Sequence, residues 1–312
     1  MNYGFVYALI GVFLWSSAAT IAGILENSAN FLTITLALQI GGFIFFFIWF
    51  RTRDKNAVNN NIKSLKNYLK RKKIKTYIVF NLTMFSLFIT LYYLSFYYSI
   101  QNSPKIQANI LNYIWPMLTP LFGTYIFKNS ERKIGYYELS LLLLSFSGAI
   151  LVAWDISSGN PFSNFHNGYI FALLAALFAA LYLNFIFNLK RFIKSTPILY
   201  MAALGLAFPF TLIASFVFNI DININLSSIP WLLYLSIIVF GGGQYLLVKS
   251  IEIDNMVTIS AVAYLTPLFS SLMLNAFLDV PYTETIIIGG MLIVFSNILL
   301  SNSFSLVKNN NR

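Results

Sequence analysis

The segment LNYIWPMLTPLF at residues 111–122 ends in five residues that recur at 265–269, again as LTPLF and again inside a long apolar stretch. A short polar break follows each copy, and GAILV at 148–152 then aligns with SNILL at 296–300. Internal symmetry of this kind is typical of membrane transporters. The repetition predicts two similar halves, 1–154 and 167–304, joined by residues 155–166 and followed by a tail at 305–312.

Both halves are rich in apolar residues. The 312-residue chain is 58% hydrophobic and only 10% charged, whereas soluble domains carry about 25% charged residues. A bilayer core about 30 Å thick requires roughly 20 apolar residues per helix. The sequence therefore predicts an all-α membrane protein with ten transmembrane helices, at 3–25, 31–50, 76–99, 104–127, 136–154, 167–188, 197–218, 230–250, 257–278 and 283–304.

The basic residues predict how these helices are oriented. With the N-terminus in the cytoplasm, every one of the 20 Lys and Arg residues except Lys105 falls on the cytoplasmic side. The positive-inside rule therefore places both termini in the cytoplasm and the protein in the cytoplasmic membrane, with 155–166 as an external loop. Five spans in each half are an odd number, so the second half inserts upside down, giving an inverted repeat.

Half of the Lys and Arg residues lie in a single cytoplasmic loop at 51–75, directly against the third predicted span. A basic cluster beside a membrane helix is attracted to anionic lipid headgroups. We therefore expect anionic lipid, and not nucleic acid, as the partner of residues 51–75.

The residue inventory argues against an enzyme. The chain has no Cys and a single His, His166, which removes thiolate metal sites, Cys nucleophiles and His-based triads. No Asp or Glu falls in the middle of a predicted span. The sequence predicts neither a metal site nor a cofactor.

Two tryptophans lie near the predicted middle of the membrane. Tryptophan normally lies at the interface, but Trp15 and Trp115 are about 11 or 12 residues into their helices. Asn112 and Trp115 are three residues apart and share a helix face, with Tyr113 beside them. A buried indole or amide at this depth needs a polar partner or a wet cavity.

Further deep polar and aromatic residues complete a predicted central cavity. Prolines 116, 120 and 267 are expected to bend the helices that flank it. By contrast, Tyr97 and Tyr98 are expected at the outer interface. The cavity is assigned Trp15, Ser16, Tyr92, Asn112, Tyr113, Trp115, Tyr182 and Gln244, with Pro116, Pro120 and Pro267 as gating or kink residues.

The duplicated ten-helix plan resembles the drug/metabolite transporter superfamily, whose members consist of two EamA-type halves. Residues 111–122, FLWSS at 13–17 and NMVTISAVAYLTPLFSSLM at 255–273 resemble its aromatic amino-acid exporter branch. This resemblance implies export of aromatic and other neutral amino acids, or related small metabolites, through a central cavity. It also implies cavity positions at Trp15, Phe88, Tyr92, Tyr113, Trp115, Phe178 and Tyr264, with Phe178 standing where an indole is usual.

Two other transport functions remain open. A multidrug or quaternary-cation exporter should have a deep carboxylate, and an importer of a nucleotide-like metabolite such as S-adenosylmethionine should have a deep Lys or Arg. A cavity of aromatics, amides and hydroxyls suits a neutral or zwitterionic solute better. The sequence allows a monomer or a homodimer.

Overall fold

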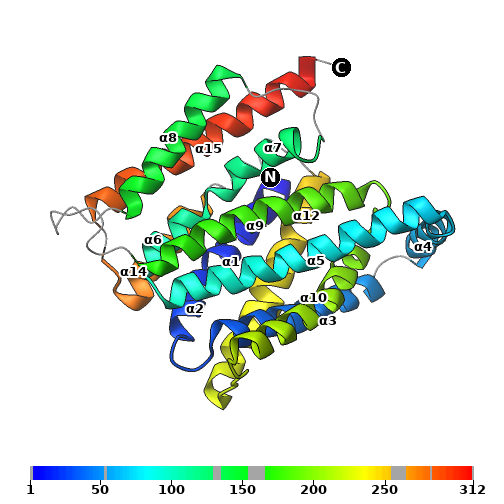
Figure 1. Cartoon of the computed structure of the whole chain (residues 1–312), viewed down its shortest axis with the longest axis horizontal. Helices are drawn as coiled ribbons and strands as arrows, with labels where there is room; N and C mark the ends of the chain where they lie inside the picture. Colours follow the sequence, from blue (N-terminus) through cyan, green and yellow to red (C-terminus); the bar gives the residue numbers. More distant parts are fainter. Residues whose placement is uncertain are drawn as a thin grey trace.

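The computed structural model describes residues 3–52, 55–128, 135–153, 166–253, 265–281 and 283–310, and within these ranges it is helical with no β-strand (Figure 1). The α-helices are α1 (Tyr3–Ser16), α2 (Ala18–Ile24), α3 (Phe31–Thr52), α4 (Lys55–Leu69), α5 (Lys72–Gln101), α6 (Lys105–Asn112), α7 (Trp115–Tyr125), α8 (Tyr136–Ala153), α9 (Asn167–Lys190), α10 (Thr196–Phe218), α11 (Ile229–Leu233), α12 (Gly243–Ile253), α14 (Thr266–Leu278) and α15 (Glu284–Asn310). A 3-10 turn η2 (Leu226–Ser228) precedes α11, and a π-helix η3 (Tyr234–Gly242) joins α11 to α12.

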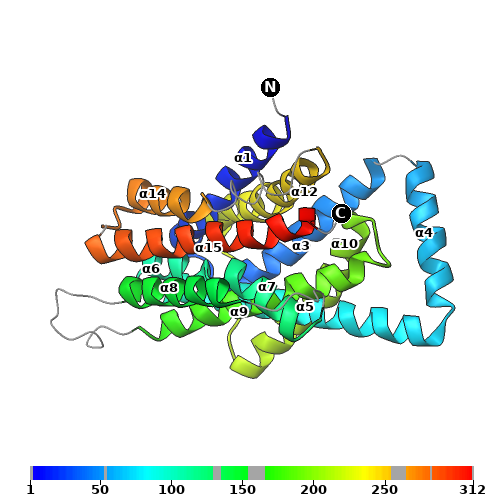
Figure 2. The same cartoon turned by 90° about the horizontal axis from the view of Figure 1, so that it is seen from above.

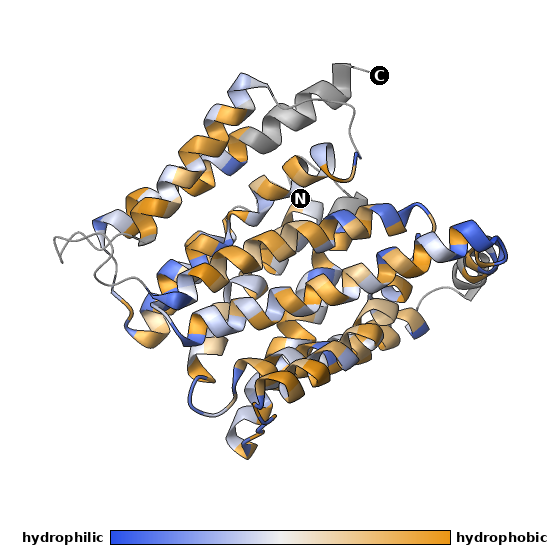
Figure 3. Cartoon of the chain, in the orientation of Figure 1, coloured by the Kyte–Doolittle hydropathy of each residue, from blue (hydrophilic) through white to orange (hydrophobic). Residues whose placement is uncertain are grey.

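Hydrophobic residues cover most of these helices, and hydrophilic residues gather towards their ends (Figure 3). In the described part of the chain, six stretches are long and apolar enough to cross a membrane: Tyr3–Ile24, Phe31–Thr52, Lys72–Gln101, Asn167–Lys190, Thr196–Phe218 and Leu226–Ser250. Shorter apolar helices cover Leu139–Val152, Thr266–Leu278 and Glu284–Leu299. Each predicted span overlaps a helix, while the number that cross the membrane stays a prediction.

Three of the predicted spans are interrupted or distorted helices. The first divides into α1 and α2 at Ser17, and the fourth divides into α6 and α7 at Tyr113 and Ile114. Pro116 explains the second break, because it has no N–H to bond the Asn112 carbonyl and disfavours helical geometry just before it. The eighth span passes through the π-helix η3, a rare geometry often found at functional sites.

The three prolines named as gating or kink residues lie in α7 and at the start of α14. Pro116 and Pro267 stand in the first turns of these helices, a position that tolerates proline. Pro116 directly follows the α6–α7 break, whereas helix α7 continues through position 120 to Tyr125. A gating role for these prolines stays a prediction.

The basic segment expected to be a loop contains a helix. Helix α4 lies crosswise to α5 (Figure 2) and spaces Ile62, Leu65 and Leu69 so that they share one face. Tyr68 packs edge-on against Phe192, with ring centroids 5.4 Å apart. The apolar residues of α4 are too few to signal a span, but Leu65 and Tyr68 pack against the buried core.

The two most extensive helix pairs are α5–α9 and α8–α15. Helices α8 and α15 run side by side at one edge of the molecule (Figure 1), attached mainly through α6 and α7. Gly148 and Gly289 face each other there, and a Cβ on Gly289 would lie 2.5 Å from the Gly148 carbonyl oxygen. Small residues let membrane helices approach this closely.

Candidate functional site

A cavity of about 150 Å³ lies where the broken helices meet. Its lining is largely aromatic and hydroxyl-bearing, and no charged residue contributes to its described wall. The lining comes from residues as far apart in the sequence as Trp15 and Thr266. The lining residues are Trp15, Ala18, Leu38, Tyr92, Tyr93, Phe96, Tyr97, Asn109, Asn112, Tyr113, Trp115, Ala179, Tyr182, Leu183, Tyr200, Leu235, Val239, Phe240, Gln244 and Thr266.

The α6–α7 break brings three polar or aromatic residues to this cavity. Asn112 is the last residue of α6, Tyr113 caps it, and Trp115 is the first residue of α7. The Tyr113 carbonyl, which the break frees from regular helical bonding, accepts a hydrogen bond of 3.0 Å from Asn297 Nδ2. The Asn112 side chain lies close to the Tyr92 hydroxyl. The Asn297 contact holds the interrupted backbone in place.

The α1–α2 break also brings an aromatic residue to the cavity. Trp15 packs directly over Gly243, where a Cβ would lie 2.6 Å from the indole Cδ1. Next to it, Ser16 is fully buried and its hydroxyl donates to the Val12 carbonyl at 2.8 Å and to the Thr266 carbonyl at 3.2 Å. Glycine at 243 therefore makes room for the indole, and Ser16 ties α1 to the start of α14.

Aromatic contacts line the α5–α9 side. Tyr92 and Tyr182 have ring centroids 5.6 Å apart, and Tyr93 meets Phe240 of η3 edge-on at 5.6 Å. Phe88 and Phe178 also contact each other, with centroids 5.9 Å apart, but neither contributes to the cavity wall. The rings thus continue along the α5–α9 interface beyond the cavity.

The structure brings together most of the residues expected at the site. Trp15, Tyr92, Asn112, Tyr113, Trp115, Tyr182 and Gln244 all line the cavity. Ser16 lies behind the wall, and Phe88 and Phe178 lie beside it at the α5–α9 interface. Tyr264 lies outside the described residues. That these side chains bind a solute stays a prediction.

Several lining residues were not expected from the sequence. Tyr97, expected at the outer interface, is 3% exposed and faces the cavity. Tyr93 and Tyr200 are also buried against it. Asn109 gave a signal that could have been used, because it lies three residues before Asn112 and therefore on the same helix face. Whether a tyrosine points into the cavity depends on how its helix is rotated against the neighbouring helices.

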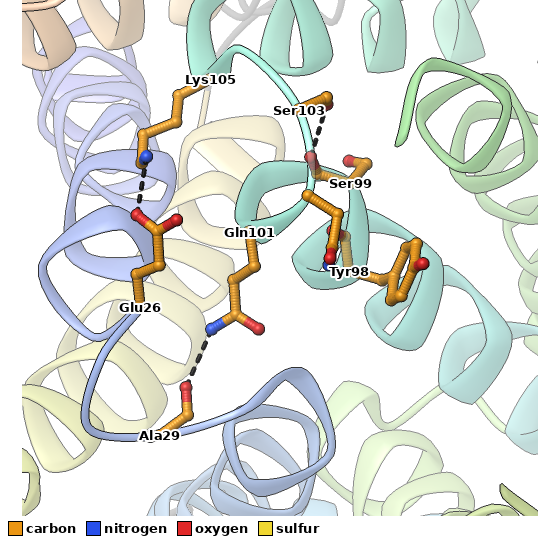
Figure 4. A network of polar contacts seen from close by, with 8 residues as sticks. Glu26, Ala29, Tyr98, Ser99, Gln101, Ser103 and Lys105 are labelled. Carbon is orange, nitrogen blue, oxygen red and sulfur yellow. Dashed lines mark hydrogen bonds and ion pairs between the residues drawn. The ribbon is translucent and has the colours of Figure 1, made fainter. Parts of the chain in front are cut away.

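The predicted external end is tied together by polar contacts (Figure 4). Lys105 Nζ lies 2.7 Å from Glu26 Oε2, which joins the start of α6 to the segment after α2. Gln101 Nε2 donates to the Ala29 carbonyl at 2.8 Å. The one basic residue expected outside therefore has an acidic partner.

Comparison with known proteins identifies the family. The EamA-like transporter family matches residues 2–154 and 166–302, so the chain belongs to that family of multi-pass membrane proteins that transport small molecules. One solved structure, described only as "Crystal structure of protein", shares the fold with a TM-score of 0.58 at 18% identity, over 96% of this chain and 98% of that one. A search of the curated proteins gives no match.

Proposed function

We propose that the protein is a secondary transporter that exports aromatic and other neutral amino acids, or related small metabolites, across the cytoplasmic membrane. In this proposal ten helices form two inverted halves, with both termini in the cytoplasm, and the central cavity opens to each side in turn. The family match falls on two segments separated at 155–165, which supports the division into halves.

The cavity lining is the observation that carries the proposal. Trp15, Trp115 and Tyr92 supply flat apolar surfaces, while Asn112 and Gln244 supply donors and acceptors. Small-molecule sites typically combine a mostly apolar wall with a few placed polar groups. Discontinuous membrane helices beside such a site are a recurring feature of secondary transporters.

The direct test is uptake of radiolabelled phenylalanine, tyrosine, tryptophan and threonine into proteoliposomes. We expect saturable uptake, and we expect Trp115→Ala to lower kcat/KM about 10-fold or more, because the variant removes an aromatic wall of the cavity. Trp231→Ala is the matched control, since Trp231 is 41% exposed on α11 and does not line the cavity. Equal loss in both variants would contradict the assignment of the site.

The same assay separates the other transport functions. Aromatic walls also attract quaternary cations, so methyl viologen is included as a substrate. Uptake of methyl viologen without amino-acid uptake would favour a cation exporter. Uptake of S-adenosylmethionine alone would favour a nucleotide-like metabolite as the substrate. No uptake of any amino acid would contradict the proposal.

The orientation can be tested separately, because the chain has no native Cys. We expect a single cysteine at Ser163, in the proposed external loop, to react with an impermeant maleimide added to intact cells. A cysteine at Asn311, in the proposed cytoplasmic tail, should react only after the cells are opened. The reverse pattern would overturn the proposed topology.

A further inference from the structure

Two buried polar atoms beside the cavity have no hydrogen-bond partner among the described residues. They are Nδ2 of Asn109 and Oδ1 of Asn112, and the two residues are only 2% and 3% exposed. A buried polar group left unpaired costs about 1–3 kcal/mol. Such groups in native proteins usually find a partner in a water molecule or a ligand.

The two asparagines are placed to act on one molecule. They are three residues apart on α6, so they share a face of that helix, and both line the cavity. Asn112 lies close to the Tyr92 hydroxyl, and its Oδ1 has no hydrogen-bond partner among the described residues.

We infer that this pair binds the charged groups of a zwitterionic α-amino acid. Asn109 Nδ2 donates a hydrogen bond to the carboxylate, and Asn112 Oδ1 accepts one from the ammonium group. The inference rests on the proposed function and adds to it the residues that recognise the backbone of the substrate. Hydrogen bonds to charged groups are stronger than neutral ones, so neutral amides can hold both ends without a fixed charge.

The rest of the cavity suits the side chain of the solute. Trp115, Trp15 and Tyr92 line the same cavity as the two asparagines. Their flat apolar surfaces suit an aromatic or branched aliphatic side chain.

The experiment compares three ligands that differ only in their charged groups. Phenylalanine has both groups, phenethylamine lacks the carboxylate, and 3-phenylpropionate lacks the ammonium. Binding to the full-length protein in lipid nanodiscs is followed by quenching of tryptophan fluorescence, because Trp15 and Trp115 line the cavity. We expect phenylalanine to bind the native protein about 10-fold or more tightly than either analogue.

Each variant should weaken only the ligands that carry the charged group bound by the substituted asparagine. Asn109→Leu is expected to weaken phenylalanine and 3-phenylpropionate about 10-fold and to leave phenethylamine unchanged. Asn112→Leu is expected to weaken phenylalanine and phenethylamine about 10-fold and to leave 3-phenylpropionate unchanged. Ser270→Ala is the control, because the Ser270 hydroxyl is also buried and unpaired in the described structure but does not line the cavity.

The outcomes separate this inference from the proposed function. If the native protein binds phenylalanine, and both variants keep the native ratios of affinity among the three ligands, the inference fails and the proposed function stands. Equal loss of all three ligands, or the reverse pattern, would also overturn it. If the native protein binds none of the three, the inference fails, and uptake of the other amino acids decides the proposed function. Should a leucine variant not fold, Asn109→Ala and Asn112→Ala provide the same comparison.

Discussion

The two most extensive helix pairs of the molecule pack in opposite ways. Helices α5 and α9 meet through large rings and amides, including a hydrogen bond of 3.1 Å from Asn188 Nδ2 to Asn81 Oδ1. Helices α8 and α15 meet through the backbones at Gly148 and Gly289. The α5–α9 pair forms a wall of the cavity, whereas no described residue of α8 or α15 lines it.

This difference relates packing to function. Aromatic side chains can turn about their own bonds and leave the backbone where it is, so a wall of rings can adapt to a solute. A contact between two glycines has no side chains to rearrange. The two helices that it joins can therefore separate only by moving their backbones apart. We therefore regard α8–α15 as a fixed support and α5–α9 as the adaptable wall of the proposed transport site.

The largest effect is expected at the glycine contact. A Cβ at position 289 would lie 2.5 Å from the Gly148 oxygen and 2.9 Å from the Val152 nitrogen, both backbone atoms that cannot move aside alone. Gly289→Leu should therefore lower the stability by about 2–3 kcal/mol. Thermal unfolding of the purified protein in detergent measures this loss.

Gly205→Leu is the control for this prediction. A Cβ at position 205 would have only Phe43 Cε2 within reach, at 3.8 Å. Its melting temperature should match that of the native protein. Equal melting temperatures for Gly289→Leu and the native protein would mean that the α8–α15 contact is not a fixed support.

An intermediate effect is expected at the amide pair between α5 and α9. Asn188→Leu leaves the buried Asn81 oxygen without its donor, and polar contacts between membrane helices average about 0.6 kcal/mol with values up to about 1.7 kcal/mol. We expect a loss of about 1 kcal/mol. The double variant Asn81→Leu/Asn188→Leu should recover part of it, because both partners are removed. A double variant no more stable than Asn188→Leu would contradict this explanation.

The smallest effect is expected at Phe88. Its ring is stacked on Phe185 at 5.8 Å and tilted against Phe178 at 5.9 Å, outside the cavity wall. Phe88→Leu should cost about 0.5 kcal/mol of stability and leave the KM for phenylalanine unchanged. Tyr182→Leu, on the cavity side of the same interface, should raise that KM. A raised KM in Phe88→Leu would instead place Phe88 in the transport pathway, as the family resemblance implied.

Hydropathy predicted the positions of the helices but not their internal breaks. Long apolar runs have no alternative to helix in a bilayer, so every expected span overlaps a helix, and the EamA-type resemblance is confirmed by the family match. The exporter branch, the inversion of the halves and the orientation stay predictions. The break at Tyr113 depends partly on Asn297, a partner 184 residues away, which no local pattern specifies. Helix α4 was missed because its apolar residues are sparse.

The cavity was predicted where depth and chemistry agreed. Trp115 and Asn112 combine a central position with a side chain that lipid disfavours, and the structure places both in the lining. Tyr97 has no such signal, since a tyrosine near a helix end is typical of the interface. Its burial depends on how α5 is rotated against its neighbours, which the sequence of α5 alone does not determine.

The Gly148–Gly289 contact also has a consequence for biosynthesis. Helix α8 is synthesised long before α15, with about 140 residues between the two glycines. At ribosomal rates of about 5–20 residues per second, roughly 7–30 seconds pass between the synthesis of α8 and that of α15. In the proposed ten-helix topology, the glycine face of α8 is exposed to lipid during that interval. A weakened contact is therefore expected to reduce the yield of new protein at the membrane more than the lifetime of protein already folded.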